Sequence, residues 1–190
     1  MTRTTNARIA GFTFLFYIAV AFPSMVLFDR VTRGDGIAAQ LASIARHASE
    51  VRLMIILTLL GSFSALVLAV TLYRITRDQD SDLAMLAMTC RLTEGVISGV
   101  SVTETLGLLW LATATGAHTP DPGAARAVGA YLLKPTSESV AVTSTFFAVG
   151  SLLFSYLFLR GRMIPIALAW LGVLASVLLV MGLPPQIAGL

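Results

Sequence analysis

Residues 83–111 of this 190-residue chain read LAMLAMTCRLTEGVISGVSVTETLGLLWL, an apolar run that contains Arg91, Glu94 and Glu104. The run is long enough for a membrane-spanning helix, which needs about 20 mainly apolar residues to cross a hydrocarbon layer of about 30 Å. A charged side chain near the middle of that layer costs at least ~2.5 kcal/mol, so such residues usually face a protein interior or a polar cavity. We therefore expect Arg91 and Glu94 to face other helices.

Four further apolar runs lie on either side of this one. Together the five runs predict spans at residues 9–28, 53–73, 83–106, 139–159 and 165–182. Hydrophobic residues make up 56% of the chain and charged residues 12%, which is more apolar surface than a small soluble core absorbs. The sequence thus predicts an all-α fold, a polytopic transmembrane helix bundle that forms one domain over residues 1–190. The expected location is the inner (plasma) membrane of a bacterium.

The first run has two interpretations. Arg3 and Arg8, an apolar stretch and the residues Ala19-Val20-Ala21 imitate the three regions of a signal peptide. The apolar stretch nevertheless continues to Phe28, which favours a membrane anchor.

The loop after the first run contains a short amphipathic pattern. Ile37, Leu41 and Ile44 recur at helical spacing, opposite polar residues that include Gln40 and Arg46. This pattern is typical of a short interfacial helix on the membrane surface. A loop helix that extends the second span is the alternative, and the sequence does not separate the two.

Apart from Arg91, which lies within a predicted span, the lysine and arginine residues divide equally between the two predicted sides of the membrane. One set is Arg3, Arg8, Arg74, Arg77, Arg160 and Arg162; the other is Arg30, Arg33, Arg46, Arg52, Arg126 and Lys134. The first set is concentrated in the N-terminus and two short turns, where the positive-inside rule is most reliable. We therefore expect a cytoplasmic N-terminus and, with five spans, a C-terminus outside.

Helix geometry sets the depth of each charged residue in the third span. At a rise of 1.5 Å per residue from Leu83, Arg91 lies ~12 Å deep, Glu94 ~16 Å and Glu104 ~31 Å. Arg91 and Glu94 share a helix face, so they can neutralise each other. Glu104 lies at about the depth of Arg52 in the second span, which predicts an Arg52–Glu104 pair between the helices.

The Arg91 and Glu94 pair has two interpretations. It is an internal ion pair that fixes helix packing, or a site in which Arg91 holds an anionic or carbonyl group while Glu94 exchanges a proton or a cation. Gly95 and Gly99, which follow directly, form a small-xxx-small step that lets another backbone come close. We expect this step to serve packing within the bundle.

Patterns for catalysis, cofactors or metals are missing from the sequence. The two histidines, His47 and His118, lie in predicted connections without paired-histidine spacing. Cys90 is the single cysteine, and Lys134 is the single lysine, so neither a multi-cysteine metal site nor a basic nucleic-acid patch is predicted. We expect a protein that is not an enzyme and binds no cofactor, metal or nucleic acid. Its expected partners are membrane lipid and a second copy of the chain or another membrane protein.

Several segments spread along the chain form a recognisable set. They are Arg8-Ile9-Ala10-Gly11, Glu50-Val51-Arg52-Leu53, Leu72-Tyr73-Arg74, Leu83-Ala84, Arg91-Leu92-Thr93-Glu94, Gly150-Ser-Leu-Leu-Phe-Ser-Tyr156-Leu157 through Arg160, Met163-Ile164-Pro165, Leu168 and Trp170-Leu171-Gly172. Together they resemble a bacterial family of integral membrane proteins, the domain of unknown function 4386.

The resemblance implies little about activity, because this family has no established biochemical function. It includes Arg91 and Glu94 in a shared pattern and leaves Glu104 out. Similar proteins usually have six spans, the last following a proline and including an acidic residue, whereas this sequence ends at Leu183-Pro-Pro-Gln-Ile-Ala-Gly-Leu190. The span count therefore depends on whether this chain is naturally short or truncated.

Two functions remain open. The first is a non-enzymatic membrane subunit or accessory protein with a structural or regulatory Arg91 and Glu94 pair. The alternative is a carrier or channel-like protein for a small solute or protons that works through the same residues. A cavity that reaches Glu94 would favour the second, and a dry contact with Arg91 the first.

Overall fold

The computed structural model describes residues 2–115 and 120–187 of the chain. Their regular structure is entirely helical: α1 (Arg3–Val31), α2 (Ile37–Arg46), α3 (Ala48–Thr76), α4 (Ser81–Thr113), α5 (Pro122–Arg160) and α6 (Ile166–Ile187). All of these helices except α2 are long and apolar enough to cross a membrane. The predicted all-α transmembrane bundle with five spans is therefore confirmed.

Each helix extends beyond the apolar run that predicted it. The difference is largest for α5, in which the apolar section is Val140–Arg160 but the helix begins at Pro122. The Asp121 side chain caps this start by accepting hydrogen bonds from the backbone N–H groups of Gly123 and Ala124. Apolar run length marks the part of a helix that fits in lipid, whereas capping residues mark where the helix begins.

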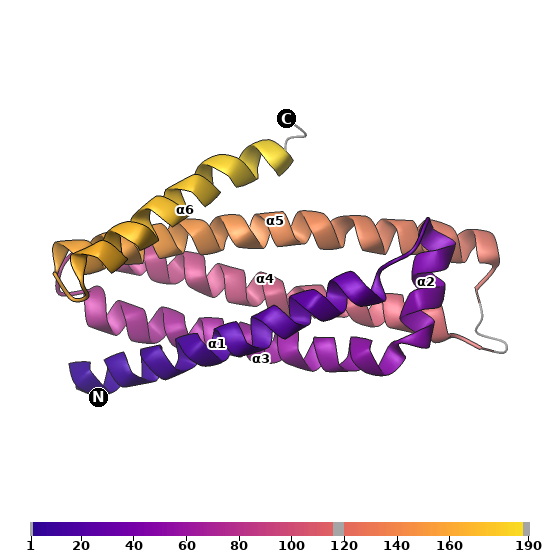
Figure 1. The fold of residues 1–190 in the computed structure, drawn as a ribbon, viewed down its shortest axis with the longest axis horizontal. Helices are drawn as coiled ribbons and strands as arrows, with labels where there is room; N and C mark the ends of the chain where they lie inside the picture. Colours follow the sequence, from indigo (N-terminus) through magenta and orange to yellow (C-terminus); the bar gives the residue numbers. More distant parts are fainter. Residues whose placement is uncertain (1, 116–119, 188–190) are drawn as a thin grey trace.

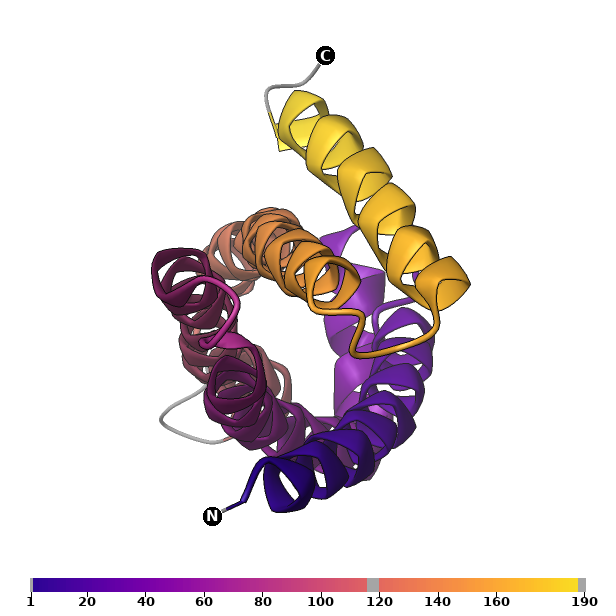
Figure 2. The ribbon, with the colours of Figure 1, turned by 90° about the vertical axis from the view of Figure 1, so that its left-hand side faces the viewer.

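Four of the spans surround the centre of the bundle. They follow one another in the order α1, α3, α4 and α5, with each helix packed against the next (Figure 2). In the part of the chain that the structure describes, α1 and α5, the first and last of the four, do not pack directly against each other. Within the described residues, α6 packs against α5 alone, and it diverges from the bundle toward its C-terminal end (Figure 1).

The helix in the first loop, α2, lies across one end of the bundle (Figure 1). His47 separates it from α3, so it does not extend the second span. Its Ile44 belongs to an apolar cluster with residues of α1, α3 and α4. Ile37 and Leu41 lie against α5, each 3.1 Å from the position that a Cβ on Gly129 would take. The apolar side of α2 is thus turned toward the ends of the spans.

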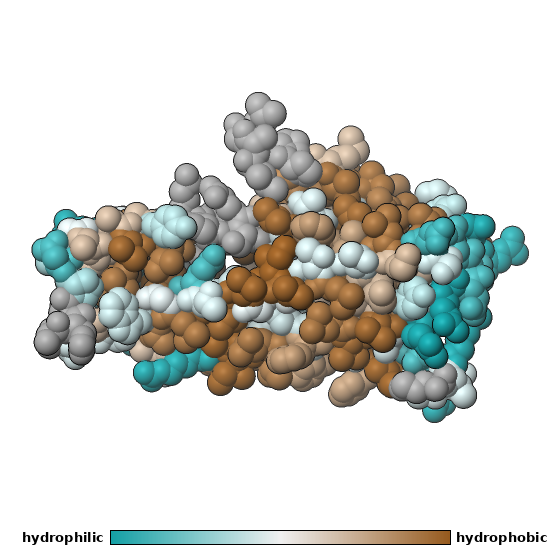
Figure 3. All heavy atoms as spheres, turned by 180° about the vertical axis from the view of Figure 1, so that it is seen from behind, coloured by the Kyte–Doolittle hydropathy of each residue, from teal (hydrophilic) through white to brown (hydrophobic). Residues whose placement is uncertain are grey.

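The two ends of the bundle are polar and the zone between them is hydrophobic (Figure 3). At the end that holds the α3–α4 and α5–α6 turns, Arg160 donates a hydrogen bond of 3.1 Å to Asp80. Asp80 also caps α4 by accepting from the backbone N–H of Leu83. This N–H, together with the nearby Arg160 guanidinium, holds the pKa of Asp80 below its usual range. The two turns are therefore joined at the polar boundary.

α3 comes close to α4 at Gly95. A Cβ there would be 3.0 Å from Leu66 Cδ2 and 3.2 Å from the Ser62 carbonyl oxygen, and a Cβ on Gly99 would be 3.6 Å from Ser62 Oγ. The small-residue step thus faces α3 within the bundle. Gly61 of α3 is turned toward Val20 of α1 instead.

Replacing Gly95 by alanine should destabilise the protein, with Gly11→Ala as the matched control. Alanine in a helix interior stabilises the helix by up to ~1 kcal/mol relative to glycine. Gly11→Ala should show this gain, because nothing lies within 4 Å of a Cβ at that position. At Gly95 the added methyl group meets backbone, and overpacking of this kind costs about 1–3 kcal/mol. Thermal unfolding in detergent should show a lower melting temperature for Gly95→Ala and an equal or higher one for Gly11→Ala. Equal shifts in the two variants would contradict the close approach.

Candidate functional site

Arg91 and Glu94 form an ion pair inside the bundle. They lie one turn apart on α4, and Arg91 Nη1 is 2.5 Å from Glu94 Oε2. Only 3% of Arg91 and 2% of Glu94 are exposed. Burial of both charges is tolerated in a membrane when they are paired and turned away from lipid. The structure therefore brings together the two residues that the depth calculation selected.

Two aromatic side chains from other helices complete the surroundings of this pair. Tyr17 of α1 donates a hydrogen bond of 2.9 Å to Glu94 Oε1. The Arg91 guanidinium lies over the ring of Phe147 of α5, 4.7 Å from its centroid, and 5.6 Å from that of Tyr17. Such cation–π contacts strengthen when water is excluded. Sequence reasoning missed both aromatics, although a tyrosine in the middle of a span, far from the interface, was an available signal.

A glycine on α5 makes room for the arginine. A Cβ on Gly150 would lie 3.0 Å from Cγ of Arg91, 3.1 Å from its Cδ and 3.2 Å from the carbonyl oxygen of Ala87. The aliphatic stem of Arg91 therefore lies directly on the α5 backbone. Gly150 belongs to a segment that carries the family resemblance, and this contact gives it a physical role.

Arg52 and Glu104, the second predicted pair, do not form an ion pair in the described part of the chain. Arg52 is exposed while its neighbour Val51 is buried, and Glu104 is half-buried with no hydrogen-bond partner for Oε2. Depth along a helix does not fix direction around its axis, where successive residues point about 100° apart. The match in depth was therefore insufficient to predict a contact.

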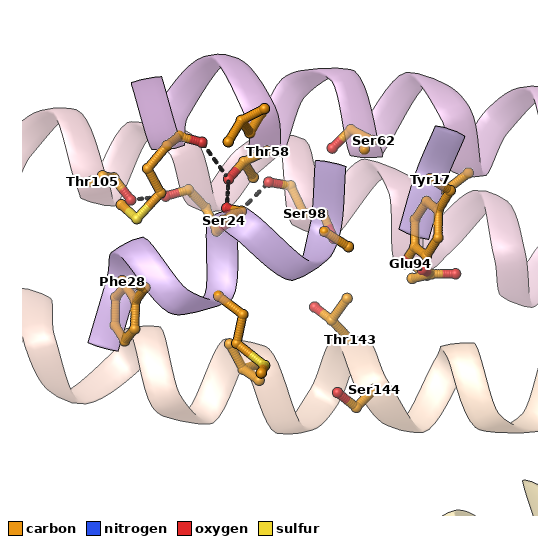
Figure 4. Close-up of a pocket in the computed structure, with 18 residues that line it drawn as sticks. Tyr17, Ser24, Phe28, Thr58, Ser62, Glu94, Ser98, Thr105, Thr143 and Ser144 are labelled. Atoms are coloured by element: carbon orange, nitrogen blue, oxygen red, sulfur yellow. Dashed lines mark hydrogen bonds between the residues drawn. The ribbon is translucent and has the colours of Figure 1, made fainter. Parts of the chain in front are cut away.

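A cavity of about 540 Å³ lies between α1, α3, α4 and α5 and reaches Glu94. Its lining residues are Tyr17, Ala21, Ser24, Met25, Phe28, Met54, Leu57, Thr58, Gly61, Ser62, Ala65, Glu94, Ser98, Ser101, Thr105, Val140, Thr143 and Ser144. Figure 4 shows Tyr17 beside Glu94 at one end, with Phe28 and Thr105 toward the other. Arg91 does not line the cavity, so only the acidic member of the pair faces it.

Hydroxyl groups supply most of the polar atoms of this cavity. Several bind within their own helices, as Thr58 does by donating to the Met54 carbonyl at 2.9 Å, and Ser24 also shares a hydrogen bond of 3.2 Å with Thr58. Ser62 differs, because it is 7% exposed and its Oγ has no hydrogen-bond partner. Buried polar groups are nearly always bonded, so an exception calls for a functional or structural reason. The serine and threonine pattern was not singled out in the sequence, because such residues are common in membrane helices.

Metal ligands do not gather within residues 2–115 and 120–187, where no three His, Cys, Asp or Glu side chains form a group. The ring Nδ1 of His47 is 2.9 Å from the Ser43 carbonyl at the end of α2. His118 lies outside the described residues.

A model of the domain of unknown function 4386 (DUF4386) matches residues 9–183 of the chain. The chain belongs to this family. The match includes every segment that forms the ion pair and the cavity, and its description names no activity. No curated protein and no solved structure matches the chain.

Glu94→Gln should destabilise the fold more than the double change Arg91→Met with Glu94→Leu. The single variant leaves the buried Arg91 without a counter-charge, which in buried pairs costs about 3–5 kcal/mol, whereas matched apolar replacement is often close to neutral. Thermal unfolding in detergent and in lipid nanodiscs should rank wild type and the double variant above Glu94→Gln. If the double variant is the least stable, charge balance is not what the pair contributes.

Proposed function

We propose that this integral membrane protein is a non-enzymatic, carrier-like binding protein that holds a small polar group in the cavity beside Glu94. The observation that supports this most directly is the cavity itself, which ends on a buried carboxylate and is lined by hydroxyl groups from all four helices. Its volume lies within the range of about 300–1,000 Å³ typical of small-molecule sites. A pair that only fixed helix packing would require neither the cavity nor its polar lining.

The two members of the ion pair have different roles in this proposal. Arg91 is enclosed by Phe147, Tyr17 and the α5 backbone at Gly150, and it fixes the charge and position of Glu94. Glu94 faces the cavity. Arg91 is accordingly a positioning residue and Glu94 a binding residue.

The arrangement of Glu94 favours binding over catalysis or proton exchange. Its Oε1 accepts from Tyr17 and its Oε2 faces Arg91, so both oxygens are directed by protein groups. A general base needs an oxygen within hydrogen-bond reach of the proton that it removes. A carboxylate held from both sides acts better as a fixed polar wall than as a proton acceptor.

A subunit or accessory role in a membrane assembly is the second candidate. It is favoured by α6, whose described residues pack against α5 alone and leave large apolar side chains exposed, among them Leu171, Leu178 and Met181. Lipid can cover the same surface, so this role and ligand binding are compatible.

We propose the inner membrane as the location, with the N-terminus in the cytoplasm. The structure gathers the ends of the helices that carry Arg3, Arg74, Arg160 and Arg162 at one end of the bundle, joined by short turns. Short loops rich in arginine stay on the cytoplasmic side.

Cysteine reactivity tests whether the cavity is polar and accessible. In a Cys90→Ala background, Ser98→Cys places a thiol in the cavity and Val96→Cys places one on the exposed side of the same helix. Only the thiolate reacts with maleimides, and a lipid-facing thiol stays protonated. N-ethylmaleimide, which permeates membranes, should modify Ser98→Cys about tenfold faster or more. Equal slow rates at both positions would overturn the proposed function.

Ser62→Ala should leave the ligand-free protein as stable as the wild type or more stable. Its hydroxyl is buried without a partner, a state that costs about 1–3 kcal/mol, and alanine removes it. Ser64→Ala is the matched control on the same helix, because Ser64 donates a hydrogen bond of 2.7 Å to Leu60. The control should lose about 0.5–1.5 kcal/mol in denaturant unfolding. A larger loss for Ser62→Ala would show that its hydroxyl already has a structural role.

A further inference from the structure

Described side chains close both ends of the cavity. Toward α2 the space is filled by an apolar cluster, which encloses a void of about 10 Å³ and consists of Val31, Ile44, Val51, Met54, Leu108 and Leu109. Toward the other end the cavity stops at Tyr17 and Glu94, and the next layer of α1 and α3 is another cluster, built on Ala10, Leu68 and Ile75. Neither end gives a described path to water.

The side between α1 and α5 is different, because among residues 2–115 and 120–187 these two helices do not pack directly and α6 does not contact α1. Met25 of α1 and Val140 of α5 both line the cavity, yet 65% of Met25 and 59% of Val140 are exposed. A residue that lines a cavity and is also exposed marks its rim. Both residues belong to spans, so the rim faces the lipid phase.

The lining divides into an apolar rim and a polar interior. Met25, Phe28 and Val140 supply an apolar edge, whereas the polar groups come chiefly from α3 and α4. The charges of Arg91 and Glu94 cancel, and the other described polar residues in the lining are uncharged. The chemistry that matches is an uncharged polar head on an apolar chain.

The direction of the hydrogen bonds further specifies the head. Thr58, Ser101 and Thr105 donate their protons to carbonyl oxygens of their own helices, and Tyr17 donates to Glu94. The oxygens of Tyr17, Ser101 and Thr105 are left as acceptors, whereas the Thr58 oxygen already accepts from Ser24. Acceptors are matched by a donor, and an uncharged donor of small size is a hydroxyl group. The unpartnered Ser62 hydroxyl can accept from it or donate to it.

We propose that the cavity takes a single-chain amphiphile with an uncharged, hydroxyl-bearing head, which reaches it from the lipid phase between α1 and α5. The head lies against Ser62 and the wall formed by Glu94 and Tyr17, and the chain leaves past Met25 and Val140. This inference rests on the proposed function, to which it adds the ligand class and the direction of access.

The test uses the Ser98→Cys protein in lipid nanodiscs and measures its rate of modification by N-ethylmaleimide. Three compounds are added as protecting agents: 1-oleoylglycerol, methyl oleate and glycerol. Methyl oleate has the same chain without the hydroxyl groups, and glycerol has the hydroxyl groups without the chain. We expect 1-oleoylglycerol to slow modification by about fivefold or more at saturation, and the other two to have little effect.

Tryptophan at the rim tests the direction of access. Met25→Trp with Val140→Trp should narrow the opening. This double change should reduce both the rate of modification by N-ethylmaleimide and the protection by 1-oleoylglycerol. Phe22→Trp with Val142→Trp is the matched control, because these residues are exposed on the same helices but do not line the cavity. Ser62→Ala in the Ser98→Cys protein should weaken protection by 1-oleoylglycerol, measured relative to that variant's own rate of modification in the absence of amphiphile.

The outcomes separate this inference from the proposed function. If Ser98→Cys does not react, the proposed function fails. If it reacts but glycerol protects as well as 1-oleoylglycerol, or a charged, membrane-impermeant maleimide reacts equally fast, the cavity opens to water and lateral access is overturned. Equal protection by methyl oleate would overturn the hydroxyl head, and equal effects of the rim and control tryptophans would overturn the opening between α1 and α5.

Discussion

The ion pair between Arg91 and Glu94 is the contact on which the rest of the bundle depends. Both charges lie deep in a span, where an unpaired charge is costly. The packed helices must therefore supply each charge with partners. Tyr17 from α1 and Phe147 from α5 provide the remaining contacts, so three spans meet at one level. Gly150 lets α5 come close enough to cover the arginine.

The cavity lies between the ion pair and α2, where the contacts between helices differ from those at the level of the pair. Past Glu94, toward α2, Ser101 and Thr105 donate to carbonyl oxygens of their own helix, and the hydrogen bond between Ser24 and Thr58 joins α1 to α3 rather than to α5. Groups that are satisfied within their own helix do not draw neighbouring helices together. α1 and α5 therefore have no described polar contact to hold them against each other here, and the space between them remains. α2 closes the end of this space with apolar side chains.

The sequence predicted the features that follow from distance along a single helix. Five spans followed from the lengths of the apolar runs, and the burial of Arg91 and Glu94 followed from their depth. Features that depend on direction around the helix axis were out of reach: Arg52 and Glu104 match in depth but do not pair, and Tyr17 contacts Glu94 across 77 positions of sequence. The start of α5 at Pro122 was missed because apolar runs mark lipid contact, whereas Asp121 caps the helix.

The same ion pair limits what the cavity can hold. A cationic head would compete with Arg91 for Glu94 and so weaken a contact already made at 2.5 Å. An anionic head would lie beside the carboxylate and be repelled by it. Removing one partner of a buried pair leaves the other charge uncompensated. An uncharged hydroxyl breaks nothing: it adds hydrogen bonds to oxygens that still accept and gives Ser62 a partner. A membrane protein that keeps its buried charges paired with each other therefore leaves its cavity suited to neutral ligands, and such ligands dissolve in the lipid that its rim faces.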